Sequence, residues 1–379
     1  MLISDLGKIV TGKTPLTKRK EYWDGDIPFV TPGDLQNSKH INSTSRYISE
    51  QGMLSVKGTI LPKDSVCVSC IGNIGYVGKT TKTSVSNQQI NSIIVNDKHN
   101  ADYVYYLMKS LWRYFKNCEN QSTTLSILNK TQFSKIQVVD HSREEEDRIA
   151  EFLNMLDLKI EMNTNVNDNL LQQARALYKD RFIDLTPFDG SMPSDWHLGT
   201  VSEIIELHDS KRIPLSSRER AELDKIYPYY GATSVMDYVD RYLFDGIYLL
   251  LGEDGTVVDG QGFPILQYVE GKFWVNNHAH IITGKNGFTV EMLYLLFSLT
   301  NVQSIVTGAV QPKISQANLN KVPVVIPSKT ELTAFDESIQ PFFAEIRNLR
   351  TENDRLVSVR DSLLPRLMSG ELDVPDLDL

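Results

Sequence analysis

Four short segments of the chain carry residue types that could do chemistry, and the first resembles a nucleotide-binding loop. Residues 7–14 match the pattern G-x-x-x-x-G-K-[ST], in which backbone amides and a lysine hold phosphates. Such a loop must follow a buried strand and open a helix, whose amides cradle the phosphates. Only six residues precede Gly7, and Pro15 follows the pattern directly. We therefore expect no nucleotide site here.

The other three segments are a methyltransferase-like motif, a histidine pair and two adjacent carboxylates. Residues 226–231 (IYPYYG) weakly match the Asn/Asp-Pro-Pro-aromatic signature of adenine methyltransferases, but Ile226 and Tyr227 replace its polar residue and first proline. His278 and His280 would share one face of a strand, yet no further ligands cluster near them in the sequence. The acidic residues at 253–254 lack the Glu-x-Lys partner of a nuclease site. The sequence thus predicts no catalytic residues and no metal ligands.

The elements that must position any site occur twice. Residues 133–139 (FSKIQVV) and 142–145 (SREE) return 186 positions later as residues 319–325 (LNKVPVV) and 328–331 (SKTE). Each copy predicts a short strand, then a Ser-x-x-Glu capping box that opens a long helix. At ~1.5 Å per residue, helices near 40 residues would be roughly 60 Å long, longer than a small domain is wide. Such helices act as spacers or as surfaces for partners.

Residues at every seventh position define a predicted a/d seam along both helices. The first helix contributes Ile149, Leu153, Leu156, Ile160, Asn163, Asn167, Leu170, Ala174, Leu177 and Arg181. The second contributes Phe335, Ile339, Phe342, Ile346, Leu349, Asn353, Leu356, Arg360, Leu363 and Leu367. Asn167 and Asn353 are 186 positions apart, and a buried asparagine in such a seam penalises slipped registers.

Composition and charge limit the class of protein. The chain has 379 residues, of which 41% are hydrophobic, and no apolar run long enough to span a membrane, so we predict a soluble, cytoplasmic protein with two ordinary cores. Its three cysteines, Cys67, Cys70 and Cys118, are too few for a disulfide framework, and Cys67 and Cys70 would face opposite sides of a strand. Residues 1–140 hold 17 Lys and Arg against 11 Asp and Glu, a net charge of +6, within a chain of net charge −9.

Outside the helices, two globules read as mixed α/β. Short strands are expected at residues 27–30, 65–68, 91–95 and 246–251, and helices at 103–112 and 291–299. The repeat is weaker here. Residues 72–75 match 252–255, and 87–94 loosely match 276–282, so loops of different length would lie on a common scaffold.

With these features the chain resembles the specificity (S) subunits of type I restriction-modification enzymes over nearly its full length. Four kinds of segment carry the resemblance. Residues 6–15 with 26–35, and residues 226–233, are similar to the openings of target-recognition domains, residues 140–153 to the junction with the helix, and residues 363–372 to the carboxyl end. The order and duplication of these segments are more specific than any one of them.

The resemblance implies an α+β (mixed α/β) fold with a pseudo-twofold internal repeat. The implied parts are target-recognition domain 1 (1–140), spacer helix 1 (141–185), a linker (186–195), target-recognition domain 2 (196–327), spacer helix 2 (328–369) and a tail (370–379). The helices would form an antiparallel, coiled-coil-like spacer that docks two modification subunits and, in some systems, restriction subunits. Each domain would read half of a bipartite double-stranded DNA target. S-adenosylmethionine would bind the modification subunits, so no cofactor and no catalysis are expected on this chain.

Candidate DNA contacts follow from this reading. Fixed cations would hold phosphates, and amides on expected loops would read base edges. The cationic candidates are Lys13, Lys18, Arg19, Lys20, Lys79, Lys82, Lys211 and Arg212. The other candidates are Thr14, Asn73, Asn87, Gln88, Asp254, Asn276, Asn277, Gln311 and Lys313. Two alternatives remain open: the lysines form a solvated face, and Asn87 and Asn276 hold turns.

A different class of function also fits the composition. The globule at residues 190–327 carries 10 Lys and Arg against 15 Asp and Glu, a net charge of −5, which repels phosphates unless the charges are segregated. A non-enzymatic scaffold whose duplicated globules bind protein is therefore the alternative prediction.

Overall fold

Two long helices are present where the duplicated capping boxes predict them, as α5 (Arg143–Tyr178) and α10 (Lys329–Met368). At the start of α5 the Ser142 hydroxyl accepts from the Glu145 amide at 3.3 Å, and the Glu145 carboxylate accepts from the Ser142 amide at 2.7 Å. The second box is only half formed. The Ser328 hydroxyl accepts from the Glu331 amide at 3.4 Å, but the Glu331 carboxylate pairs with Arg181. A guanidinium is a stronger partner for a carboxylate than a backbone amide is.

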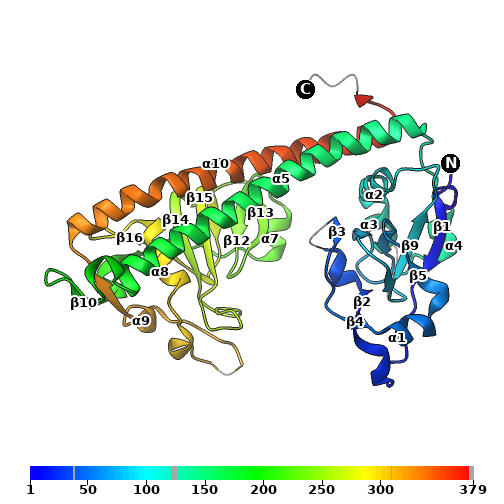
Figure 1. Ribbon diagram of the computed structural model, residues 1–379. Helices are drawn as coiled ribbons and strands as arrows, with labels where there is room; N and C mark the ends of the chain where they lie inside the picture. The colour runs from blue at the N-terminus through cyan, green and yellow to red at the C-terminus, as the bar shows by residue number, and fades with distance from the viewer. Residues whose placement is uncertain (37–38, 121–125, 309, 375–379) are drawn as a thin grey trace. The chain divides into compact units, whose positions relative to one another are not determined.

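The helices pair in antiparallel fashion, because their contacts run in opposite directions along the two sequences. Asp157 pairs with Arg360 at 2.8 Å, the Asn163 amide donates to Glu352 at 2.8 Å, and Arg181 pairs with Glu331. The computed structural model describes residues 1–36, 39–120, 126–308 and 310–374. It divides into unit 1, Met1–Glu161 with Asn353–Leu379, and unit 2, Met162–Glu352 (Figure 1). Each unit thus combines one globule with part of each helix.

Unit 1 contains two sheets, and in each most neighbouring strands are far apart in the sequence. In spatial order, the larger sheet contains β1 (Gly7–Thr11), β9 (Ile90–Val95), β6 (Val66–Ser69), β7 (Val77–Thr80) and β3 (His40–Ile41). The smaller contains β4 (Tyr47–Ile48), β2 (Trp23–Val30), β8 (Ser84–Ser86) and β5 (Ile60–Leu61). The helices of this globule are α1 (Glu50–Ser55), α2 (Ala101–Ser110), α3 (Trp112–Asn120) and α4 (Lys130–Ser134). Helix α2 packs against β6 and β7.

Unit 2 repeats this plan with longer strands. Its main sheet contains, in spatial order, β11 (Ile205–Leu207), β16 (Ala279–Gly284), β14 (Phe244–Gly252), β15 (Leu266–Val275), β12 (Tyr227–Tyr230) and β13 (Val235–Val239). A second sheet pairs β10 (His197–Thr200) with β17 (Pro323–Ile326). The helices are α6 (Val201–Ile204), α7 (Ser217–Ala221), α8 (Val290–Ser298) and α9 (Gln316–Leu319), and α8 packs against β14, β15 and β16 (Figure 1). The mixed α/β class is confirmed, as are the predicted strands within β2, β6, β9 and β14.

The strand registers show that the two sheets share one framework. In unit 1, Ile93 of β9 pairs with Ile9 on one side and Val66 on the other. In unit 2, Ile282 of β16 pairs with Leu207 and with Leu249 in the same way. The trio β1-β9-β6 therefore corresponds to β11-β16-β14.

Different residues of the two helices belong to the two cores. In unit 1, Leu153 and Leu367 are fully buried, and in unit 2 Ala174 and Ile339 are. Among the predicted seam residues, Ile346 is buried and several others are half-buried. These include Leu156, Ile160, Asn167, Leu170, Phe342, Asn353 and Leu356.

The predicted seam is wrong at the end of α5. Leu177 is 43% exposed, whereas Tyr178 and Phe182 are buried against Phe335. The buried positions Ala174, Tyr178 and Phe182 follow one another every fourth residue rather than in heptads, and residues Lys179–Ile183 form a π-helical turn. A straight α-helix has 3.6 residues per turn and drifts away from a seven-residue repeat.

Two further expectations concern the cysteines and membranes. Cys67 and Cys70 are buried in different hydrophobic clusters, and burial raises the pKa of each thiol to about 12. Within the described ranges, no helix combines the length and the apolar character that a membrane crossing requires.

Candidate nucleic-acid interface

In unit 1 three loops meet at one edge of the larger sheet, where β1 and β6 end and β9 begins. The Gly12 amide donates to the Ile90 carbonyl at 3.0 Å. A side chain at position 12 would collide with the Asn87 carbonyl, because an added Cβ would lie 2.1 Å from that oxygen. Next to this close approach, the Thr14 hydroxyl donates to the Gln88 side-chain oxygen at 2.7 Å. The loops after β1 and before β9 are therefore fixed to each other.

A buried polar pair closes the same edge from inside. The Thr11 hydroxyl donates to the Asn91 side-chain oxygen at 2.6 Å, and the Asn91 amide donates to the Leu128 carbonyl at 3.2 Å. Asn91 is 2% exposed, so these partners satisfy groups that water does not reach. The pair ties the end of β1 and the segment at Leu128 to β9.

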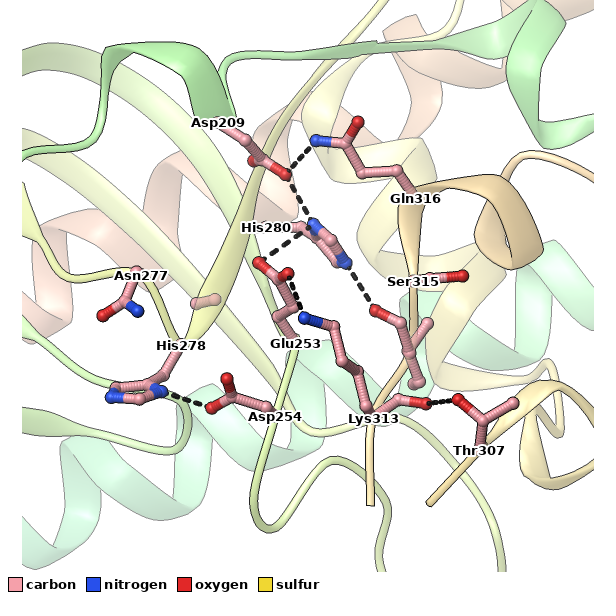
Figure 2. Close-up of polar contacts among 12 residues, drawn as sticks. Asp209, Glu253, Asp254, Asn277, His278, His280, Thr307, Lys313, Ser315 and Gln316 are labelled. Carbon is pink, nitrogen blue, oxygen red and sulfur yellow. Dashed lines mark hydrogen bonds and ion pairs between the residues drawn. The ribbon is translucent and has the colours of Figure 1, made fainter. Parts of the chain in front are cut away.

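Unit 2 has ionisable residues in the same two places. Asp209 follows β11 and accepts from His280 Nδ1 at 2.6 Å, while His280 Nε2 reaches the Ile314 carbonyl at 2.8 Å (Figure 2). Both ring nitrogens thus face acceptors. Burial raises the pKa of Asp209, but the hydrogen bond from His280 and those from Ile281 and Gln316 outweigh it and leave that pKa below its usual value.

Glu253 extends this cluster toward the surface. Its carboxylate contacts Arg212 Nη1 at 2.5 Å and Lys313 Nζ at 3.1 Å. Burial raises the pKa of Glu253, and the hydrogen bonds from Arg212 and Lys313 with the nearby His280 charge outweigh this and lower it. Figure 2 shows Lys313 reaching Glu253 from the neighbouring segment. Arg212 also donates to the Ala279 carbonyl at 2.8 Å.

Asp209, Glu253 and His280 could also be read as metal ligands, because their ligand atoms lie within 4.8 Å of one another. Both carboxylates already contact cations, with Arg212 on both and Lys313 on Glu253. A metal ion would have to displace those cations from partly buried positions. We interpret the cluster as an internal charge network that holds the ends of β11, β14 and β16.

Most predicted phosphate contacts lie at the surface. Lys13, Lys18, Arg19, Lys20, Lys82 and Lys211 are exposed. Arg19 pairs with Glu21 at 3.5 Å, and Lys82 donates to the Asp26 carbonyl at 3.4 Å. These contacts are weak and exposed, so the side chains can turn toward a phosphate.

Lys79 and Arg212 differ from the other predicted phosphate contacts, because the fold engages both side chains internally. Lys79 is 6% exposed and pairs with Asp102 at 2.6 Å and Asp64 at 3.2 Å, inside unit 1. The Arg212 guanidinium donates to the Glu253 carboxylate and to backbone carbonyls. Sequence alone did not separate them from the other cations, because Asp64 lies 15 positions from Lys79 and Glu253 lies 41 positions from Arg212.

Asn87 and Asn276 take the alternative role of holding turns. Both are buried, and their side-chain oxygens accept from the amides of Gln89 and His278, two positions ahead. Neither offers its side chain to the surface. Their burial favours the turn-holding alternative over base reading.

The loops matched as 72–75 and 252–255 are aligned differently by the structure. The Gly72 amide donates to the Ser126 carbonyl at 3.2 Å, and the Gly255 amide to the Pro312 carbonyl at 3.0 Å, and both glycines have positive φ. Gly72 therefore corresponds to Gly255, not to Gly252. The predicted contact Asn73 is exposed on this loop, as is Gln311 on the segment before Lys313.

Asp254 pairs with His278, which the sequence predicts to lie in a strand. His278 precedes β16 instead of lying in it and pairs with Asp254, so the two histidines do not share a strand face (Figure 2). Asp209 and Gln316, which complete the network, carried no sequence signal. They are 71 and 36 positions from His280, and only the sheet brings them together.

Comparison with known proteins gives a consistent result. The description "Type I restriction modification DNA specificity domain" matches residues 1–172 and 193–356, most of the chain. The chain is 28% identical to the type I restriction enzyme MjaIX specificity subunit of Methanocaldococcus jannaschii, over 99% of this chain and 93% of that protein. It is 38% identical to the HindI specificity subunit of Haemophilus influenzae over 38% of this chain and 31% of that protein.

A solved structure has the same fold. The crystal structure of the type I restriction-modification S subunit from M. genitalium superposes with a TM-score of 0.56 at 16% identity, covering 97% of this chain and 95% of that one. The family match spans both globules and most of both helices. The chain therefore belongs to the family of type I restriction-modification DNA specificity proteins.

Proposed function

We propose that this chain is the DNA specificity subunit of a type I restriction-modification complex, with each unit reading one half of a bipartite double-stranded target. One observation carries the proposal: the two units share a strand framework but differ in the polar residues at the same sheet edge. Thr11 and Asn91 occupy the places that Asp209 and His280 occupy in unit 2. A common scaffold with different loop chemistry suits the reading of two different sequences.

The two globules differ in net charge, and therefore in how strongly each can attract DNA phosphates. The exposed lysines of unit 1 can neutralise phosphates, whereas the globule of unit 2 carries a net charge of −5 over residues 190–327. We expect weak DNA affinity from the chain alone and stronger affinity when partner subunits surround the duplex.

Helix α5 offers a surface for such partners. Exposed apolar side chains recur along it at Met155, Leu158, Met162 and Val166, each between 45% and 56% exposed. This spacing of three and four residues places them along one helical stripe. Two modification subunits would dock on the helices and bring S-adenosylmethionine and the methyl-transfer chemistry, joined by restriction subunits in some systems. This chain would supply recognition without catalysis.

The deciding experiment is single-base mapping of methylated adenine in host cells with the chain intact and with it deleted. Loss of methylation at one split motif, with two unlike halves around a fixed gap, supports the proposal and gives the target. Unchanged methylation in cells that express the modification subunit would favour the protein-binding scaffold.

A further inference from the structure

The turn that leads into β9 in unit 1 has the same construction as the turn that leads into β16 in unit 2. In unit 1, β8 runs parallel to β2 and the Asn87 amide then donates to the Val30 carbonyl at 2.9 Å. In unit 2, β15 runs parallel to β12 and the Asn276 amide donates to the Tyr230 carbonyl at 3.0 Å. The two turns therefore start from equivalent backbone positions.

The buried asparagine of each turn fixes the direction of the residue after it. Asn87 accepts from the Gln89 amide at 3.0 Å, and Asn276 accepts from the His278 amide at 2.8 Å. Asn87 and Asn276 are 8% and 4% exposed, whereas the next residue is exposed in both units. That residue is an amide each time, Gln88 in unit 1 and Asn277 in unit 2.

These two amides are prepared for a bidentate contact. The Gln88 oxygen accepts from Thr14 at 2.7 Å, which orients the amide plane and leaves one lone pair and the NH₂ group for a ligand. Asn277 is linked to the charge network through its backbone, whose carbonyl accepts from Arg212 at 3.3 Å. Figure 2 shows its side chain beside His278, with no contact marked to the Glu253 and His280 cluster.

An amide that accepts and donates side by side matches the adenine edge in the major groove, where N6 donates and N7 accepts. We propose that Gln88 and Asn277 are specificity-determining residues that each read one adenine, Gln88 in the half-site of unit 1 and Asn277 in that of unit 2. The inference rests on the proposed function. It separates these two residues from Asn87 and Asn276, which hold the turns.

The test uses the chain assembled with its modification subunits. Methylation is measured on a library of duplexes in which each position of both half-sites is varied in turn. Gln88→Ala should lose discrimination at one adenine of one half-site by roughly 10- to 100-fold, and Asn277→Ala at one adenine of the other half-site. All other positions should keep their preference.

Asn87→Ala and Asn276→Ala are the matched controls, each one residue from the proposed reader. They should weaken methylation of all duplexes alike and lower the melting temperature of the chain. If Gln88→Ala and Asn277→Ala also weaken all duplexes alike, the residues hold phosphates or the fold, and the inference is overturned. If the unaltered complex shows no sequence preference, the proposed function fails instead.

Discussion

Asn91 of β9 and His280 of β16 are equivalent residues of different chemistry. The Asn91 side chain contacts the Leu128 carbonyl in unit 1, and the His280 side chain contacts the Ile314 carbonyl in unit 2. Asn91 also contacts Thr11, which ends β1, and His280 contacts Asp209, which follows β11. The framework accepts either a hydroxyl–amide pair or a carboxylate–imidazole pair in this place. This equivalence makes the pair exchangeable in principle.

Exchanging the pair gives the first prediction. His280→Asn alone should destabilise unit 2 by roughly 1–3 kcal/mol, because the buried Asp209 carboxylate loses the hydrogen bond from the imidazole ring. Adding Asp209→Thr, which recreates the pair of unit 1, should recover at least half of that loss. Denaturant unfolding, followed by the fluorescence of Trp196 and Trp274 in unit 2, measures both. Losses that simply add would show that the two residues do not act as a pair.

The acid sensitivity of unit 1 gives the second prediction. Burial raises the pKa of Asp102, but the hydrogen bonds from Lys79 and Lys39 outweigh it and hold that pKa at about 2. Because the folded pKa lies below the unfolded one, Asp102 contributes stability above about pH 4, and this is lost as pH falls toward 2. Asp102→Asn should flatten the dependence of the melting temperature on pH in this window. The exposed Asp97→Asn should leave it unchanged.

Surface and buried lysines should behave differently toward DNA. Replacing exposed Lys18 and Lys20 by Gln should reduce the slope of log affinity against log salt by about 2 for the assembled complex, since each phosphate contact contributes about 0.9. Lys79→Met removes one of the two lysines that pair with Asp102 and should cost about 1–3 kcal/mol of stability, because Lys39 still pairs with that carboxylate. Its folded fraction should keep the unaltered salt slope. An equal fall in slope for Lys79→Met would return that residue to the phosphate contacts.

The length of the helix pair should set the gap between half-sites. Removing seven residues from α5 and seven from α10 shortens the pair by roughly 10 Å, at ~1.5 Å per residue. We expect the gap in the methylated motif to shrink by about three base pairs, or the complex not to assemble. The bases read at either end should stay the same. Methylated-adenine mapping distinguishes the outcomes, and changed bases around an unchanged gap would contradict the spacer role.

Local patterns predicted the elements, and long-range contacts decided the site. The first capping box and the strands could be read from neighbouring residues, because their periods are set by the backbone. The partner of Glu331 could not, since Arg181 is 150 positions away and a guanidinium competes with the local amide. A strict heptad predicts Leu177 in the seam, but Tyr178, the last residue of α5, and Phe182, in the π-helical turn, are the buried residues.

The loops show the same limit. Asn87 and Gln88 look alike in the sequence, as do Lys79 and Lys82, but one of each pair is buried. Burial is decided by the parallel strand beside the turn and by the carboxylate of Asp102, and neither is adjacent in the chain. The types of residue at the interface were therefore predictable, whereas their separation into structural and exposed members was not.

The division of each long helix between two cores has a consequence for how such genes can change. Leu153 and Leu367 belong to the core of unit 1, so a foreign first globule acquired by recombination must fit a helix surface that it did not evolve with. The core of unit 2, which contains Ala174 and Ile339, would not be replaced together with the first globule. Inheritance of one half of the target should therefore be separable from the other, provided that the residues facing the shared helices stay compatible.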